Sequence, residues 1–217
     1  RIMRDSDTIT VRTSLNGDAL PPLGQLLDIG ALQRLQNRFS AMTNLSICIC
    51  DAQSEMITTP TYASVFLRLL NRTPAGRQMC ESSIREAAQR DIAEQVSFTG
   101  QSGVSLYGTP IVFNGERLGT LVIGVRPPRK FTAELVRAVA ANAGVDEQEL
   151  QQAADLIPAW TEQDRKATFQ FVDLLAETIA TLYGQSLQIR KQLHDLQVVH
   201  EVTQLLAESH ELQDILN

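Results

Sequence analysis

Histidine, cysteine and aromatic residues are scarce in this chain of 217 residues. There are three cysteines and three histidines, aromatic residues make up 5%, and His194, His200 and His210 all lie near the C-terminal end. A catalytic thiolate needs a neighbouring base, most often histidine, and a zinc site needs three or four Cys, His or acidic ligands. The GxSxG, HExxH, Walker A and dinucleotide-binding motifs are also missing. We therefore expect no enzymatic activity, no metal and no cofactor.

Basic clusters and long apolar runs are lacking too. The net charge is −6 and the isoelectric point is about 5.1, whereas a nucleic-acid-binding domain usually carries a basic face. No apolar run reaches the roughly 18 residues of a membrane span, and the first residues lack the apolar core of a signal peptide. An odd number of cysteines favours reduced thiols over a disulfide framework. These features predict a cytoplasmic protein without direct nucleic-acid or membrane partners, and the absence of an initiator Met indicates an excised fragment.

The spacing of apolar and turn residues predicts the order of elements. Pro21-Pro22 ends an N-terminal extension, residues 1–22, which holds one short strand (Thr8 to Thr13). The helices expected after it are two from Leu23 to Thr43 separated at Gly30, then Thr61 to Leu70, Thr73 to Arg90, Thr132 to Ala143 and Asp146 to Leu156. The expected strands are Leu45 to Cys50, Glu55 to Thr58, Gln95 to Thr99, Val104 to Phe113 and Leu118 to Val125.

The strongest local signal is Asn114-Gly115-Glu116 between the last two strands, because Asn-Gly takes the positive φ of a tight hairpin at little cost. Five strands with helices between the second and the third is the order of a PAS- or GAF-like domain. The expected fold class is α+β: a PAS-like antiparallel five-stranded sheet with flanking helices over residues 23–160, followed by a long C-terminal coiled-coil helix.

That helix is predicted from Glu162 to about Glu208, because the segment has no proline and one glycine. About 45 helical residues would be roughly 68 Å long, far more than one domain requires. A 3–4 spacing of apolar residues predicts a parallel dimer seam. The seam positions are Leu175, Ile179, Leu182, Ser186, Ile189, Leu193, Leu196, His200 and Thr203. Residues 161–217 are therefore expected to form a signalling helix, with an ordinary packing helix as the alternative.

Several short motifs in the middle of the chain resemble a known family, the PocR sensory domain. They are Phe66-Leu67-Arg68-Leu69-Leu70, the run from Thr73 to Cys80, Gly103-Val104, the run from Thr109 to Gly119, and Ile157-Pro158. The resemblance covers Leu23 to Gln192. The last residues, from His200 to Leu206 and from Glu211 to Leu216, resemble the opening helix of a GAF domain, so further domains are expected in the natural protein.

The resemblance implies a PAS-like sensor that binds a small organic compound, propanediol-like molecules among them, and controls a downstream effector. Family members often have Cys where this chain has Leu67, and a Cys-His pair where it has Gly100-Gln101; Cys80 is kept. A metal or redox role is therefore disfavoured here, and small-molecule binding is the better interpretation.

Aromatic walls with a few polar tips are typical of small-ligand cavities. The candidate ligand-binding residues are Tyr62, Phe66, Arg77, Cys80, Phe98, Gln101 and Tyr107. For each of them a place in the core or on the surface is the competing interpretation. Cys48 and Cys50 should share one inward face of the first strand and serve core packing. The expected partners are a small organic ligand and a second copy of the chain; the alternatives are a dimerisation module without ligand, or a thiol or metal sensor using Cys48, Cys50 and Cys80.

Overall fold

A computed structural model describes residues 20–90, 98–125, 130–157 and 162–215. Its centre is an antiparallel sheet of four strands in the order β1-β4-β3-β2. The strands are β1 (Ser46–Asp51), β2 (Phe98–Thr99), β3 (Ser105–Phe113) and β4 (Glu116–Val125). The prediction of an α+β chain with an antiparallel sheet and a long C-terminal helix is confirmed. The expected strand from Thr8 to Thr13 lies outside the described residues.

The β3–β4 hairpin forms where the sequence predicted it. Asn114 and Gly115 have φ values of 51° and 83°, the pair of positive angles that a two-residue hairpin turn requires. The hairpin pairs over its whole length, and β1 adds to the outer edge of β4. The conformational preference of the Asn114-Gly115 turn therefore determines the pairing of β3 with β4 at the centre of the sheet.

The prediction of a five-stranded sheet was wrong for the described residues, which form four strands. In place of a strand over Glu55 to Thr58, the segment beside β1 makes two isolated bridges, Cys50 with Met56 and Ile47 with Thr61. Between them the Ile49 N–H donates to the Thr58 hydroxyl oxygen rather than to a backbone carbonyl. Pro60 follows and has no N–H to donate. A side-chain acceptor and a proline thus interrupt the ladder.

Two helices precede the sheet, α1 (Leu23–Leu26) and α2 (Ile29–Thr43). The break falls at residues 27–28 rather than at Gly30, because the Asp28 carboxylate accepts from the Gly30 N–H and caps α2. Asn44 closes α2 in the left-handed conformation with φ 55°. The cap residues, rather than the glycine, set these boundaries.

The remaining short helices are α3 (Val65–Leu70), α4 (Pro74–Gln89), α5 (Ala133–Ala143) and α6 (Glu147–Asp155). Thr73, Thr132 and Asp146 cap the last three, at the predicted starts. The prediction that α3 begins at Thr61 was wrong, because the Ser64 hydroxyl accepts from the Leu67 N–H and starts the helix there. Residues 61–63 are therefore left to run along the sheet edge.

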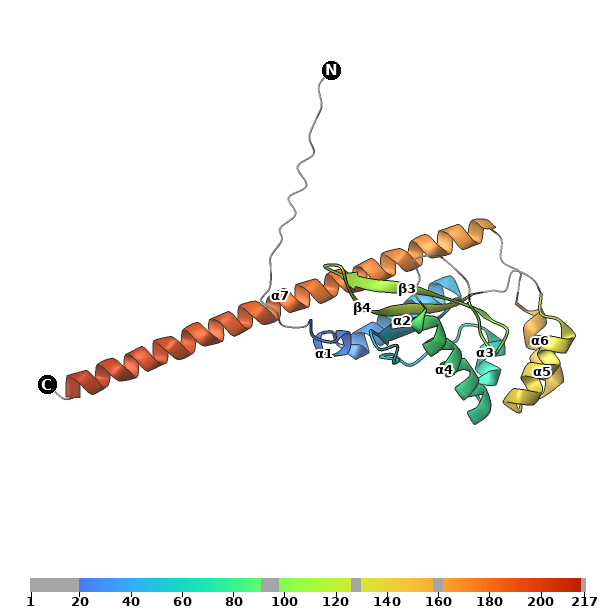
Figure 1. The fold of residues 1–217 in the computed structure, drawn as a ribbon, viewed down its shortest axis with the longest axis horizontal. Helices are drawn as coiled ribbons and strands as arrows, with labels where there is room; N and C mark the ends of the chain where they lie inside the picture. The colour runs from blue at the N-terminus through green and yellow to red at the C-terminus, as the bar shows by residue number, and fades with distance from the viewer. Residues whose placement is uncertain (1–19, 91–97, 126–129, 158–161, 216–217) are drawn as a thin grey trace, which may run out of the picture.

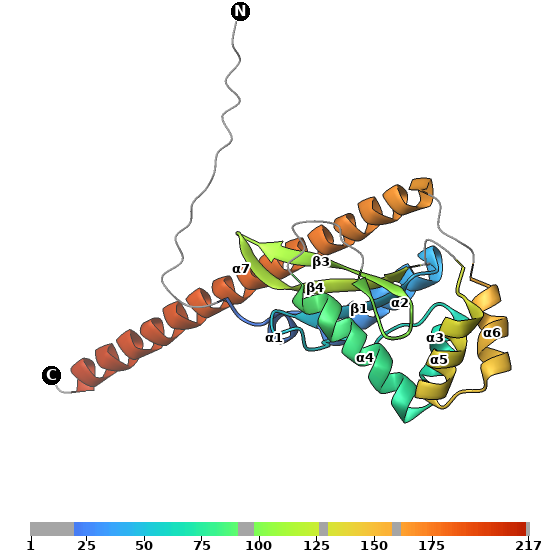
Figure 2. The same ribbon diagram turned by 45° about the vertical axis from the view of Figure 1, so that its right-hand side comes forward.

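The two faces of the sheet are covered by different helices. Alternate strand residues Ile47, Ile49, Leu121 and Ile123 pack in one apolar cluster with α7 (Glu162–Ile215) and α2. Cys48, Cys50 and Val122 point to the other face, into a cluster with residues of α4. Figures 1 and 2 show α7 along one side of the sheet and α4 across the other, with α3, α5 and α6 grouped at one end.

The C-terminal helix α7 is longer than predicted. Its 54 residues correspond to about 81 Å, and Figure 1 shows it extending far beyond the sheet. Phe169, Val172, Ile179 and Tyr183 are buried against the sheet, and the Tyr183 hydroxyl donates to the Pro21 carbonyl at 2.7 Å. Every described side chain from Gln188 to Leu206 is exposed. The first part of α7 therefore belongs to the domain core, and the rest leaves it.

Candidate functional site

Part of the segment that runs beside β1 forms one wall of a small cavity. We call residues 58–62 the strap. The cavity has a volume of about 20 Å³, room for about one water molecule. Its lining comes from β1 (Ser46, Ile47, Cys48), the strap (Pro60, Thr61, Tyr62), α4 (Ile84) and β4 (Val122, Gly124). The site is thus a small, mostly apolar space between sheet, strap and α4.

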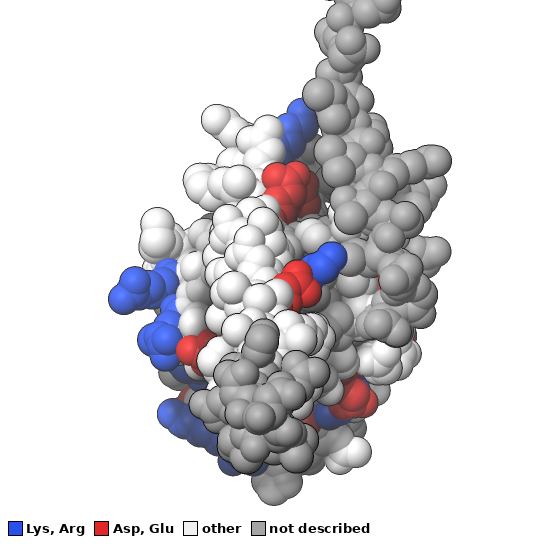
Figure 3. Space-filling model, turned by 90° about the vertical axis from the view of Figure 1, so that its left-hand side faces the viewer, with Lys and Arg blue, Asp and Glu red and all other residues white. Residues whose placement is uncertain are grey.

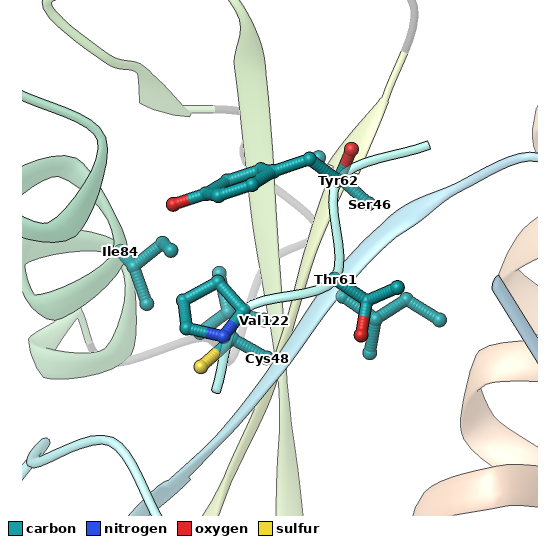
Figure 4. A pocket seen from close by; sticks show the side chains of 9 residues that line it. Ser46, Cys48, Thr61, Tyr62, Ile84 and Val122 are labelled. Carbon is teal, nitrogen blue, oxygen red and sulfur yellow. The ribbon is translucent and has the colours of Figure 1, made fainter. Parts of the chain in front are cut away.

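The Tyr62 ring closes this cavity on the α4 side. Figure 4 shows the ring reaching from the strap toward Ile84, with the Cys48 sulfur below it. Burial raises the pKa of the Tyr62 hydroxyl, and the neighbouring Cys80 and Cys48 raise it further. The hydroxyl therefore stays protonated at physiological pH.

The three cysteines are free and buried. A hydrogen bond with Cys50 and burial both raise the pKa of Cys48, and the Cys48 thiol donates to the Thr58 carbonyl at 3.4 Å. Burial raises the pKa of Cys80 to about 11, against a smaller lowering by its hydrogen bond with Tyr62. Nucleophilic cysteines have lowered pKa values, so the Cys48 and Cys80 thiols are held in their unreactive form. No three Cys, His, Asp or Glu side chains within the described ranges are grouped as metal ligands.

Slow thiol alkylation is the expected result of this burial. Raising the pKa of Cys80 from 9.0 to about 11 lowers its thiolate fraction at pH 8 by about a hundredfold, before any loss of access is counted. We expect iodoacetamide to label the native protein at least a hundredfold more slowly than the urea-unfolded protein. Intact-mass spectrometry over time measures both rates. Native labelling of one cysteine at the unfolded rate would contradict the burial of that thiol.

On its outer side the strap borders an open groove of about 500 Å³. The groove is lined by Gln33, Asn37, Thr59, Pro60, Thr61, Tyr62, Arg68 and Asn71. Pro60, Thr61 and Tyr62 therefore line both the groove and the small cavity. Displacement of this short stretch would join the two spaces.

Amide side chains of α2 hold the strap in place. Gln36, which is 1% exposed, donates to the Thr59 carbonyl and to the Thr61 hydroxyl, both at 2.8 Å, and accepts from the Thr58 hydroxyl. Gln33 accepts from the Thr59 N–H at 2.8 Å and donates back to the Thr59 carbonyl. The strap therefore moves only if these contacts to α2 break or if α2 moves with it.

On the opposite side, Arg68 of α3 donates to the Tyr62 and Ala63 carbonyls, at 3.3 and 2.6 Å. This guanidinium holds the end of the strap that carries the Tyr62 ring. Because α2 and α7 contribute to the same apolar cluster, the strap, α2 and α7 form a continuous series of contacts from the cavity to the exit helix.

Comparison with known families decides the identity of this domain. The family model described as "Sensory domain found in PocR" matches residues 25–183, well over half of the chain. The chain belongs to the PocR sensory domain family. The match reaches residue 183 and so includes the part of α7 that packs on the sheet. Neither a curated protein nor a solved structure gives a significant match.

Of the seven predicted ligand-binding residues of this PocR domain, one lines the cavity and a second lies next to that residue. Tyr62 lines the cavity, and Cys80 lies beside the Tyr62 hydroxyl. Phe66 is fully buried elsewhere, stacked on Phe131 of the α5 side with ring centroids 5.0 Å apart. Tyr107 lies on the other face of the sheet and packs edge-on against Phe169 of α7, with centroids 4.8 Å apart.

The other three predicted residues lie away from the cavity lining. Arg77 is exposed on α4, and Gln101 is exposed in the loop after β2, where its backbone N–H donates to the Ser83 hydroxyl at 3.2 Å. The backbone of Phe98 pairs with Leu106 in β2; its side chain lies outside the described set. Ligand contact by these residues stays a prediction.

Sequence reasoning missed most of the cavity wall. It placed Cys48 and Cys50 on one inward face, and this is confirmed. It did not identify Pro60, Ile84 or Val122, because none of them has a distinctive side chain. The available signal was Pro60 within an expected strand-to-helix connection, which indicates an interrupted sheet edge.

Charged side chains of both signs lie on the surface. In the view of Figure 3, from the C-terminal side of α7, most Lys and Arg side chains lie along one edge of the molecule, and Asp and Glu side chains are scattered over the face. None of the helices in the described ranges has the length and hydrophobicity needed to cross a membrane.

Proposed function

We propose that this PocR domain is the small-molecule-binding input module of a cytoplasmic signal-transduction protein. Ligand occupancy passes through a homodimeric α7 to a downstream effector domain, and the chain itself is not catalytic. The observation that carries the proposal is the small cavity between the strap, the sheet and α4. Its lining combines apolar side chains with the polar groups of Ser46, Cys48, Thr61 and Tyr62, and a mostly apolar wall with a few polar groups is the usual make-up of a small-ligand site.

The size of the cavity restricts both the ligand and the mechanism. At about 20 Å³ it admits no organic molecule as it stands, so the proposed ligand is a compound of a few heavy atoms that displaces the strap outward. A ligand shifts a conformational equilibrium only when it binds one of the two states better. Displacing the strap changes its contacts with Gln33 and Gln36 of α2, and this change is the proposed link to α7.

The dimer rests on the exposed part of α7. Large apolar side chains there are open to water, among them Ile189 at 57%, Leu193 at 57%, Leu196 at 66% and Val199 at 62% exposure. Contiguous apolar surface of this extent marks an interaction site in soluble proteins. A second copy of the chain is the proposed partner.

One observation favours a second candidate, a dimerisation module without ligand: the cavity has room for only one water molecule. Native mass spectrometry of the purified chain distinguishes the two functions. A dimer that carries a stoichiometric small mass, released on denaturation, supports the sensor. A dimer without bound mass, and without thermal stabilisation by any member of a panel of two- to four-carbon alcohols, diols and acids, supports the module.

A matched pair of tyrosine substitutions tests the location of the site. Tyr62→Phe removes the hydroxyl at the cavity, and Tyr107→Phe makes the same change on the α7 face of the sheet. Loss of one hydrogen bond to a ligand costs about 0.5–1.5 kcal/mol, so Tyr62→Phe should weaken the binding of the stabilising compound by about 2- to 13-fold. Tyr107→Phe should leave binding unchanged. Isothermal titration calorimetry measures both, and a larger loss in Tyr107→Phe would refute this location.

A further inference from the structure

The exposed side of α7 is free of charge along most of the helix. Between Ala167 and Leu206 the charged residues are Asp173, Glu177, Arg190, Lys191, Asp195 and Glu201. At 3.6 residues per turn, all six fall within an arc of about 140°. The rest of the helix circumference carries no Asp, Glu, Lys or Arg for 40 residues, about 60 Å of helix.

The middle of this uncharged side carries a regular line of residues. Phe171, Leu182 and Leu193 are spaced eleven residues apart and are 56%, 41% and 57% exposed. Thr178, Ile189 and His200 form a second series with the same spacing, and Gln204 continues the first. All of these side chains are exposed. We call these seven residues the eleven-residue line; its steps alternate between seven and four residues.

The polar members of the line are compatible with an apolar contact. The Thr178 hydroxyl donates to the Leu174 carbonyl of its own helix at 2.7 Å, which satisfies the hydroxyl and leaves the methyl group for packing. Leu174 and Leu196, 57% and 66% exposed, lie beside the line and widen it.

The line lies to the side of the residues that face the sheet. The residues of α7 that are buried in the domain, Val172, Ile179 and Tyr183 among them, lie about a quarter of a turn around the helix from the line. The seam predicted from the sequence began with Leu175 and Ile179; both are buried against the sheet, 6% and 0% exposed, and are unavailable to a partner. The eleven-residue line instead runs past the domain, from Phe171 onward.

We propose that a second copy of α7 packs on this line in parallel and in register, beginning beside the sheet rather than beyond it. The inference rests on the homodimer proposed above and specifies its contact. A two-fold parallel pair brings each residue against its own copy, so any charge on the contact would face a like charge. The absence of charge over 40 residues fits self-pairing, whereas a different partner is usually selected by complementary charges.

The spacing also sets the shape of the pair. An eleven-residue repeat has 3.67 residues per turn, close to the straight helix, and gives a slight right-handed twist, whereas a seven-residue repeat requires a left-handed supercoil. The paired helices should therefore be almost straight. The sensor domain then packs on one side of each α7, and the partner helix packs on another side. A rotation of α7 that starts at the strap would therefore change the packing between the two paired helices.

Disulfide crosslinking of single introduced cysteines tests the line, with the full chain and its buried native thiols retained. Thr178→Cys and Gln204→Cys lie on the line, Thr203→Cys lies on the seven-residue seam, and Lys191→Cys lies on the charged side; all four positions are exposed. With copper phenanthroline, we expect Thr178→Cys and Gln204→Cys to crosslink at least tenfold faster than Thr203→Cys and Lys191→Cys.

Every outcome of the scan is decisive. Fast crosslinking at Thr203→Cys with slow crosslinking at Thr178→Cys would refute the eleven-residue line and leave the dimer in place. Slow crosslinking at all four positions, together with a dimeric mass in light scattering, would place the contact elsewhere and also refute the line. A monomeric mass for the unmodified chain would refute the homodimer of the proposed function itself.

Discussion

Leu193→Glu is expected to make the PocR chain monomeric, whereas Val198→Glu should leave it dimeric. Both residues are apolar and exposed on the part of α7 outside the domain, at 57% and 44%. Leu193 lies on the eleven-residue line and Val198 about half a turn away from it. In a parallel pair, Glu at position 193 removes a buried leucine contact and places two carboxylates together, which should cost roughly 3 kcal/mol or more, over a hundredfold in Kd.

Size-exclusion chromatography with light scattering, over a range of micromolar concentrations, measures this difference. Circular dichroism serves as the control, because both variants should keep the helix content of the parent in the domain. Loss of the dimer in Val198→Glu and not in Leu193→Glu would move the contact to the opposite side of α7. Equal loss in both would indicate general disruption of the helix instead of a defined contact.

The sequence predicted best where the signal is local. Asn114-Gly115 carries its own turn preference, and Thr73, Thr132 and Asp146 cap their helices through contacts within three residues. These elements were therefore predicted within a residue or two. Residues 55–58, which lead into the strap, were mistaken for a strand because they have ordinary strand composition. The interruption of the ladder depends on a side-chain contact between Thr58 and Ile49, which apolar spacing does not reveal.

The site was predicted less well, because it depends on which residues of different strands lie opposite each other. Tyr107 is opposite Ile123, and Ile123 is opposite Ile47, so all three share the face that packs on α7. Cys48 is opposite Val122 and shares the α4 face. The sequence gives the alternation within each strand, but the register between β1 and β4 joins segments about 70 residues apart. Tyr62 and Cys80, by contrast, come together because the strap leads directly into α3 and α4.

For α7 too, the local sequence predicts the helix itself but not which of its sides packs on the sheet. Its length and its role as an exit from the domain follow from the absence of helix breakers. The side that faces the sheet does not follow from a 3–4 spacing, because two apolar surfaces are present on one helix. Leu175 and Ile179 fit the spacing of a dimer seam and yet pack on the sheet. Burial in the structure separates the two surfaces and leaves the eleven-residue line for the partner.

Gln36→Leu is expected to loosen the strap and to cost about 1–3 kcal/mol of stability. Gln36 is 1% exposed and serves three strap groups, of which the Thr58 hydroxyl is itself buried at 3%. Leucine has a similar volume and leaves the Thr58 hydroxyl without its acceptor, and an unsatisfied buried polar group costs about 1–3 kcal/mol. Gln33→Leu is the matched control: Gln33 bonds the same strap at Thr59 but is partly exposed, so water can replace its contacts and the loss should stay below about 1 kcal/mol.

Urea unfolding followed by far-UV circular dichroism measures both stabilities. Hydrogen exchange at the strap amides locates the effect: the Thr61 N–H, which donates to the Ile47 carbonyl at 2.9 Å, should exchange faster in Gln36→Leu than in the parent by more than the global loss of stability explains. If the strap must move before a ligand can enter the cavity, Gln36→Leu should also speed ligand association, because the contacts that hold the strap in place are weakened. Unchanged exchange at the strap, with stability lowered everywhere alike, would show that Gln36 supports the fold as a whole and does not control the strap.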